Sequence, residues 1–210
     1  MKQALVTMLS MQDRINSRIH DNWPAQNFDW YRAIWIECAE LIEHYGYKWW
    51  KRQTPDMAQV RLEVIDIWHF GLSALFVPGV EIERVAEAVS LEVGGLEPQE
   101  GVDVREAAEA LALHALESKT FSPARFWALM FAVGLDFDSL YSAYVGKNVL
   151  NFFRQDHGYQ EGTYEKTWGQ REDNEHLAEL VSTMDESAGD FPDQVYHALE
   201  RRYRELVRGP

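Results

Sequence analysis

Apolar residues recur every three or four positions along almost the whole chain, which is the spacing of one face of an α-helix. No stretch shows the strict alternation of apolar and polar residues that is typical of a half-buried strand. The predicted helices cover residues 2–20, 30–51, 56–78, 81–92, 103–117, 124–133, 141–154 and 193–207, with a further helix after 174. The pattern therefore predicts an all-α fold, a helical bundle in which residues 1–210 form a single domain.

Side chains that begin helices support several of these boundaries. Asp29 can accept hydrogen bonds from the free backbone N–H groups of the helix that follows it. Asp103 opens a stretch that resembles a capping box, and Ser122 precedes a proline in the first turn of the next helix. Residues 80–135 carry no other chemical signature, so we interpret them as a scaffold or variable helical region.

Two of the predicted helices each carry a pair of acids three residues apart. Glu37 and Glu40 lie on the first helix, and Glu63 and Asp66 lie on the second. At roughly 100° per residue, both pairs flank the apolar face of their own helix by the same two angles, about 300° and about 240°. If the helices pack antiparallel, four carboxylates can meet at one edge of their interface. Glu43 lies opposite the apolar face, so we place it at the surface or around the acidic site rather than among the ligands.

Four neighbouring carboxylates repel one another unless a cation lies among them, and hard oxygen ligands suit Mg²⁺ or Mn²⁺. The alternative is that each pair is an ordinary solvated part of its helix, because charged residues usually mark exposed faces. The matching geometry of the two pairs favours the metal site.

A second group of polar residues lies near the other end of the chain. Lys147, Asn151 and Arg154 recur at helical spacing. They lie opposite an apolar face formed by Tyr141, Val145, Val149, Phe152 and Phe153. Arg suits phosphate oxygens through a bidentate fork, and Lys suits them as a point charge. The alternative is a solvated basic face that pairs with nearby Glu and Asp.

Charge and cysteine content limit the possible binding partners and the cellular compartment of the protein. The net charge of −14 argues against non-specific binding to nucleic acid or to an anionic membrane. Cys38 is the single cysteine, and its apolar helical position predicts a buried thiol in a reducing compartment. The first residues lack the order of a signal peptide, and no apolar run is long enough to span a membrane. We therefore expect a soluble protein of the cytoplasm.

A carboxylate site together with a separate basic face predicts that this helical protein binds a polyphosphate. Metal ions held by carboxylates, with Lys and Arg opposite them, hold a polyphosphate for phosphoryl transfer to water. The sequence has no Gly-rich phosphate loop, no ordering typical of a catalytic triad and no zinc spacing among its histidines. We interpret His44 and His69 as surface or packed residues rather than ligands.

At this point the residues resemble a known family. Glu37-x-x-Glu40 followed by Glu63-x-x-Asp66 resembles the metal motif of the all-α NTP pyrophosphatase (MazG-like) superfamily. The more specific block 147–174, together with residues 11–16 and 48–51, resembles the dimeric all-α dUTPases. The resemblance implies a helical bundle of the all-α NTP pyrophosphatase type and a homodimer.

The resemblance also implies roles for the acids and for the basic block. Glu37, Glu40, Glu63 and Asp66 would hold Mg²⁺, with Mn²⁺ as a substitute, and Glu40 would accept the proton of the attacking water. The phosphate chain would be contacted by Lys147, Asn151, Arg154, Tyr159, Lys166 and Asn174.

Three further residues would contact the nucleoside. Gln12 and Asn16 would read the edge of uracil, because an amide pair can both donate and accept hydrogen bonds there. Trp49 would pack on the base or the sugar. The alternatives are that both amides are plain surface residues and that Trp49 or Trp50 belongs to the core.

The reaction that the resemblance implies is Mg²⁺-dependent hydrolysis of dUTP, and also of dUDP, to dUMP. Two alternatives stay open. One is another all-α nucleotide pyrophosphatase with a different substrate such as dCTP. The other is a non-catalytic helical oligomer that only binds nucleotides, against which the four acids of the motif argue.

Overall fold

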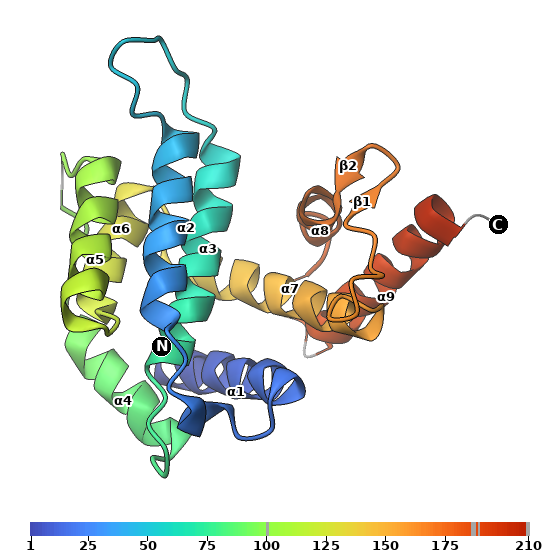
Figure 1. The fold of residues 1–210 in the computed structure, drawn as a ribbon, viewed down its shortest axis with the longest axis horizontal. Coiled ribbons are helices and arrows are strands. Elements are labelled where there is room, and N and C mark those ends of the chain that lie inside the picture. Colours follow the sequence, from blue (N-terminus) through green and yellow to red (C-terminus); the bar gives the residue numbers. More distant parts are fainter. Residues whose placement is uncertain (100, 186–187, 189, 209–210) are drawn as a thin grey trace. The chain divides into compact units, whose positions relative to one another are not determined.

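The computed structural model describes residues 1–99, 101–185, 188 and 190–208, and the regular structure in this part of the chain is mostly helical (Figure 1). The helices are α1 (Lys2–Ile19), α2 (Trp30–Tyr45), α3 (Met57–Ala74), α4 (Ile82–Val93), α5 (Val104–Ser118), α6 (Pro123–Ala132), α7 (Phe137–Asp156), α8 (Asp173–Val181) and α9 (Phe191–Tyr203). The other elements are a 3₁₀ turn, η1 (Trp23–Gln26), a π-helical turn, η2 (Arg204–Arg208), and an antiparallel hairpin of β1 (Thr167–Trp168) and β2 (Arg171–Glu172). The predicted all-α fold is confirmed; the hairpin strands are too short to show an alternating pattern.

The chain forms two compact units, residues 1–141 and 142–210, and the boundary between them falls inside α7. The interpretation of residues 1–210 as a single functional domain stays a prediction. None of the described helices is both long and apolar enough to cross a membrane.

In the first unit, α2 and α3 run side by side in opposite directions (Figure 1). Helix α5 packs on α2, α6 packs on α5, and α1 contacts α3 and α4. Trp68 of α3 is fully buried, stacks on Phe126 with ring centroids 4.7 Å apart, and donates its indole N–H to the Met8 sulfur at 3.3 Å. Gly71 allows Phe121 to approach the helix closely, because a Cβ at this position would lie 2.5 Å from its ring. Apolar packing therefore fixes α3, which carries half of the predicted acids.

The predicted helix starts at Asp103 and Ser122 agree with the structure, whereas the capping role of Asp29 and the ends of several helices differ. Asp103 and Ser122 accept backbone N–H groups at the starts of α5 and α6 as predicted. Asp29 makes no such side-chain bond, because its carboxylate pairs with Arg32 instead, at 2.6 Å. Helix α2 ends at Tyr45 rather than at residues 48–51, since Gly46 follows with a φ of +97° that takes the backbone out of the helix.

The second unit is built around an aromatic cluster on the last turns of α7. The ring of Phe153 stacks on His157 with centroids 3.9 Å apart. Trp168 of the hairpin and Tyr203 of α9 contact the same ring edge-on, at 5.7 and 5.4 Å. The hairpin, α8 and α9 therefore close around the end of α7, which the sequence predicted as a helix with an apolar face and a basic face, followed by a polar loop.

Candidate functional site

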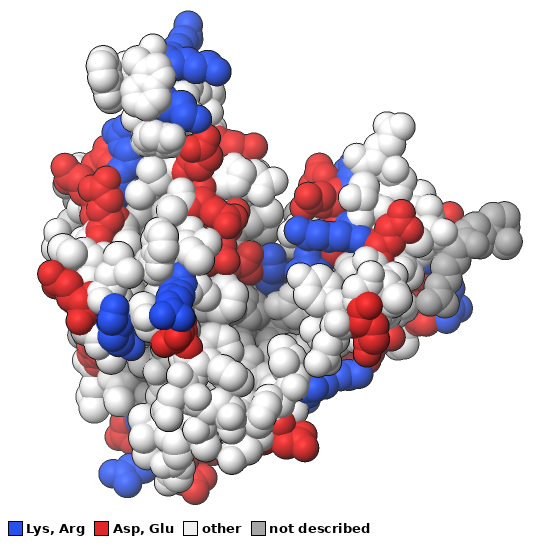
Figure 2. All heavy atoms as spheres, viewed as in Figure 1, with Lys and Arg blue, Asp and Glu red and all other residues white. Residues whose placement is uncertain are grey.

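Three of the four predicted acids meet between α2 and α3. Glu37, Glu63 and Asp66 each place one carboxylate oxygen so that these atoms all lie within 4.8 Å of one another. Glu63 is buried, whereas Glu37 and Asp66 are half-buried. Figure 2 shows acidic side chains gathered over this part of α2 and α3. We refer to Glu37, Glu63 and Asp66 as the carboxylate cluster.

Glu40 lies beside the carboxylate cluster but is not one of its three members. Its side chain is exposed, one turn further along α2 than Glu37. Its charge still contributes to raising the pKa of both Glu37 and Glu63. The sequence therefore predicted the neighbourhood of all four acids, while the structure separates three inner carboxylates from one outer carboxylate.

Burial and mutual repulsion make the cluster hard to ionise fully. Burial is the largest cause that raises the pKa of Glu37 to about 8, followed by the charge of Asp66 and a hydrogen bond to Glu63. Burial likewise raises the pKa of Glu63, against the opposing effect of the hydrogen bond from Glu37. His44 lies close by, with its Nε2 3.4 Å from a Glu63 oxygen.

The chemistry of this arrangement suits a divalent cation. The donors are all carboxylate oxygens, which are the ligands that Mg²⁺ and Mn²⁺ prefer. A bound cation would stabilise the ionised form of the three acids, whose convergence otherwise favours retention of a proton. The residues present therefore fit a divalent metal ion.

The two predicted uracil-reading amides lie on α1, and both are buried. Gln12 donates to the Asn16 oxygen at 3.1 Å, and its own oxygen lies 2.9 Å from Nδ1 of His69. Asn16 in turn donates to the hydroxyl of Ser73 at 2.9 Å. These four residues form a continuous chain of hydrogen bonds between α1 and α3, which we call the amide network. The alternative of plain surface amides is wrong.

An aromatic cavity borders the amide network at Ser73. The cavity has a volume of about 350 Å³. Its walls include Trp23, Phe28, Trp30 and Phe76, and the positively charged Lys119 also lines it. Ser73 follows Asp66 by two helical turns, or about 10 Å along α3. This distance is compatible with a nucleoside beside Ser73 and a phosphate chain near the carboxylate cluster.

Trp49 is not brought near the amide network. It lies in the loop between α2 and α3, is 90% exposed, and contacts only Trp50 among the aromatic rings of the described residues. The axis of α3 rises about 18 Å between its start at Met57 and His69, and Figure 1 shows the loop extending from the end of α3 that is opposite α1. The alternative that Trp49 or Trp50 belongs to the core is wrong, because Trp50 is also 60% exposed.

The alternative interpretation of the basic block, a solvated basic face, is wrong. Lys147 and Arg154 are 5% and 9% exposed, so they do not form a solvated basic face. The ammonium group of Lys147 donates to the Asn174 oxygen at 3.1 Å. Arg154 binds the carboxylate of Asp173 through two hydrogen bonds of 2.8 Å each. Both cations are therefore held by partners from the start of α8.

The remaining predicted phosphate contacts lie around Arg154. Asn151 accepts a hydrogen bond from a terminal nitrogen of Arg154 at 3.3 Å. Tyr159 is half exposed, and its ring centroid is 5.9 Å from the guanidinium carbon of the same arginine. Lys166 is exposed and lies 3.6 Å from the Glu172 carboxylate. The structure thus places Asn151, Arg154 and Tyr159 together, with Lys147 and Asn174 as a second pair.

The residues that hold the predicted ones in place were not predicted from the sequence. Asp173, the fully buried partner of Arg154, stood in a run that indicated only the start of a helix. His69 and Ser73 were missed as partners of the amides, although they follow Asp66 on the same face of α3 at helical spacing. That spacing was the available signal for His69 and Ser73.

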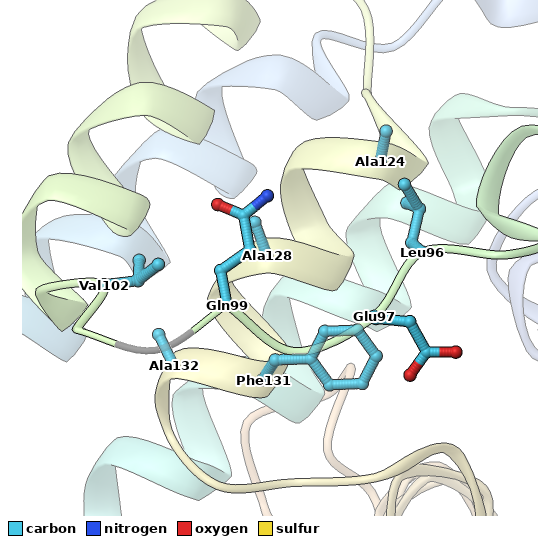
Figure 3. Close-up of a pocket in the computed structure, with 8 residues that line it drawn as sticks. All are labelled: Leu96, Glu97, Gln99, Val102, Ala124, Ala128, Phe131 and Ala132. Atoms are coloured by element: carbon cyan, nitrogen blue, oxygen red, sulfur yellow. The ribbon is translucent and has the colours of Figure 1, made fainter.

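A further cavity contains none of the residues predicted to bind metal or nucleotide. It lies between α6 and the segment before α5, with a volume of about 150 Å³ (Figure 3). It is lined by Leu96, Glu97, Gln99, Val102, Ala124, Ala128, Phe131 and Ala132. Most of these side chains are apolar, and none belongs to the carboxylate cluster or to the amide network.

Fold and site together define a class, namely an all-α protein with a carboxylate cluster between two antiparallel helices and a buried amide network beside it. The comparison with protein families gives the particular assignment: the chain belongs to the dUTPase family, whose model matches residues 4–159. It is accordingly a dUTP diphosphatase, which hydrolyses dUTP. No curated protein matches the chain. The family match includes Gln12 and all four acids, whereas Lys166, Asp173 and Asn174 lie beyond its end.

Proposed function

We propose that the carboxylate cluster binds Mg²⁺, for which Mn²⁺ can substitute, and that hydrolysis of dUTP depends on it. The convergence of Glu37, Glu63 and Asp66 is the observation that supports this proposal, because three carboxylates this close need a cation or a proton between them. A bound divalent ion supplies positive charge for phosphate oxygens and lowers the pKa of water. The same site also acts on dUDP, and the product in both cases is dUMP.

Glu40 is the residue that we assign to proton transfer. It lies beside the cluster, and its exposure leaves its carboxylate accessible to water. The three inner acids are closer together and more buried, which suits them to ion binding. Glu40 accordingly accepts the proton of the attacking water as a general base, and it also contributes negative charge to the metal site.

The base of the substrate is recognised through the amide network. Gln12 and Asn16 provide amide groups, and the aromatic cavity at Ser73 provides flat walls for a pyrimidine ring. A site that hydrogen-bonds uracil leaves polar groups unpaired when another base takes its place, and this produces selectivity. Contact between Trp49 and the base or sugar requires the loop after α2 to leave its present position.

We assign the contacts with the phosphate chain to Lys147, Asn151, Arg154, Tyr159, Lys166 and Asn174. The grouping of Asn151, Arg154 and Tyr159 supports this assignment, because an arginine fork beside further polar groups suits phosphate oxygens. We also propose that the enzyme is a homodimer of the cytoplasm. Light scattering measures the oligomeric state. The buried thiol of Cys38 is compatible with the cytoplasm.

A substrate panel tests the proposed function. Release of pyrophosphate from dUTP, dCTP, dTTP and UTP, and of phosphate from dUDP, would be measured with Mg²⁺, with Mn²⁺ and with a chelator. We expect preference for dUTP and loss of turnover in the chelator. Equal rates for dUTP and dCTP would contradict the base assignment. Full activity in the chelator would contradict the metal assignment.

A further inference from the structure

Arg154 and Asp173 form a buried, bidentate ion pair in the second unit. Nε and one terminal nitrogen of Arg154 each lie 2.8 Å from a different oxygen of Asp173. Asp173 is fully buried, and the side chain of Arg154 is 11% exposed. A fork of this kind fixes the plane of the guanidinium group as well as its position.

Asp173 also organises the segment that joins α7 to α8. The hydroxyl of Tyr164 donates to one of its carboxylate oxygens at 2.8 Å. Its backbone N–H donates to the carbonyl of Lys166 at 3.0 Å. The ring of Tyr164 stacks on Tyr203 of α9, with centroids 5.8 Å apart. One buried carboxylate therefore connects the last turns of α7 with the loop before the hairpin.

The ion pair leaves part of the arginine available for another ligand. A guanidinium group has five N–H donors. The two bonds to Asp173 and the 3.3 Å bond to Asn151 use three of them. The other two are divided between the two terminal nitrogens, and such an edge can bind a phosphate group through two hydrogen bonds.

The electrostatic state of the group agrees with this arrangement. Burial opposes the charge of Arg154, but the hydrogen bonds and the charge of Asp173 raise its pKa above the ordinary value. Burial, and then the charge of Asp173, also raise the pKa of Tyr164, so its hydroxyl stays protonated and donates. The pair therefore keeps a charged arginine in an interior that would otherwise disfavour it.

We propose that Asp173 is a positioning residue for the reaction, which holds the guanidinium group of Arg154 in the orientation that binds the phosphate chain of the substrate. This inference rests on the proposed role of Arg154 in phosphate binding. Asp173 itself does not contact the substrate. The alternative is that Asp173 competes with phosphate for Arg154. Replacing Asp173 should raise KM if it positions the arginine and lower KM if it competes with phosphate.

The test compares Asp173→Asn with the matched variant Asp156→Asn. Asp156 also accepts a tyrosine hydroxyl, from Tyr196 at 2.7 Å, but this contact is exposed. We expect Asp173→Asn to raise KM for dUTP about 10-fold with kcat within about twofold, because loss of a supporting contact misplaces the binding group. Asp156→Asn should leave both constants unchanged. An unchanged KM, or a lower one, in folded Asp173→Asn would overturn the proposal.

Arg154→Gln separates failure of this inference from failure of the proposed function. If Arg154→Gln leaves KM unchanged, the assignment of Arg154 to phosphate binding is wrong, and the inference about Asp173 fails with it. If Arg154→Gln raises KM but Asp173→Asn does not, only the inference fails. The double variant should have the KM of Arg154→Gln, since both changes act through one contact.

Circular dichroism and thermal unfolding show whether Asp173→Asn folds. If it does not, Tyr164→Phe tests the proposal instead. It removes one hydrogen bond from Asp173 and keeps the ring on Tyr203. We expect a KM raised about threefold, as for the loss of one hydrogen bond. An unchanged KM in folded Tyr164→Phe would overturn the proposal.

Discussion

A carboxylate oxygen of Glu37 on α2 lies within 4.8 Å of a carboxylate oxygen of Glu63 on α3. This proximity and the burial of both groups raise the pKa of both acids, so the pair favours retention of a proton when no metal ion is bound. Such a pair forms only where burial makes double ionisation costly. The proton and a divalent cation therefore compete for the same group of oxygens.

The metal-free enzyme should lose stability as pH rises from about 4.5 to about 8. The pKa of Glu37 is about 8 in the folded chain, against 4.5 as the ordinary value. The folded state therefore binds more protons than the unfolded state in this window, and the free energy of unfolding falls as pH increases. Urea unfolding in a chelator at pH 5, 6.5 and 8 measures the slope.

Glu37→Gln should reduce that slope, since it removes the titrating group. Glu117→Gln, on the exposed end of α5, is a suitable control and should preserve it. A stability that rises between pH 5 and 8 in the wild-type chain would contradict the explanation.

Mg²⁺ should stabilise the folded enzyme, and the effect should depend on the carboxylate cluster. A ligand at 100 times its Kd stabilises a protein by about 2.7 kcal/mol. For a chain of this size that corresponds to a rise in Tm of roughly 5–10 °C. Thermal unfolding with and without Mg²⁺ measures it. Glu63→Gln should lose most of the rise, and an undiminished rise in this variant would place the ion elsewhere.

Sequence patterns predicted the fold and the meeting of the acids because both depend on local periodicity. Glu37 and Glu63 occupy equivalent angles on helices that pack antiparallel, so helix geometry places them on facing edges, whereas the same geometry did not show that Glu40 would lie outside the cluster. The amides were predicted from a family resemblance, and the structure adds their partners. The helical spacing of Asp66, His69 and Ser73 contained that information, but nothing in it showed that α1 packs there.

The burial of the basic block depended on contacts between segments far apart in the sequence. Lys147 and Arg154 have the spacing of a solvated basic face, and only Asp173 and Asn174 from another element make their burial tolerable. The helix predicted over residues 30–51 included Trp49 and Trp50, although Gly46 ends α2 before them. Periodicity reports on a helix face, whereas burial is set by what packs against that face.

Gln12→Ala should reduce the preference for dUTP over dCTP and also destabilise the fold. The change removes the hydrogen-bond partner of both Asn16 and His69 inside the protein. Leaving buried polar groups unsatisfied costs about 1–3 kcal/mol, and loss of base reading should lower the ratio of kcat/KM values about 10-fold or more. Steady-state kinetics with both nucleotides and urea unfolding measure the two effects.

Gln3→Ala, on the exposed start of α1, is the control for this variant and should change neither quantity. A Gln12→Ala enzyme that is destabilised but keeps its full preference for dUTP would show that the amide network has a purely structural role.

Glu40→Gln should abolish most of the turnover without abolishing metal binding. Glu40 is the exposed neighbour of a cluster whose three inner carboxylates remain intact in this variant. Loss of a general base typically costs about 10²–10⁴-fold in rate, so kcat should fall in this range. The rise in Tm with Mg²⁺ should persist, although it should be smaller because one nearby negative charge is lost.

Glu43→Gln, one turn further along α2 and paired with Lys48 at 2.6 Å, is the matched control and should keep its kcat. If Glu40→Gln turns over dUTP at the wild-type rate, proton transfer belongs to another residue. If instead both kcat and the Mg²⁺ effect disappear, Glu40 acts as a metal ligand rather than as the base.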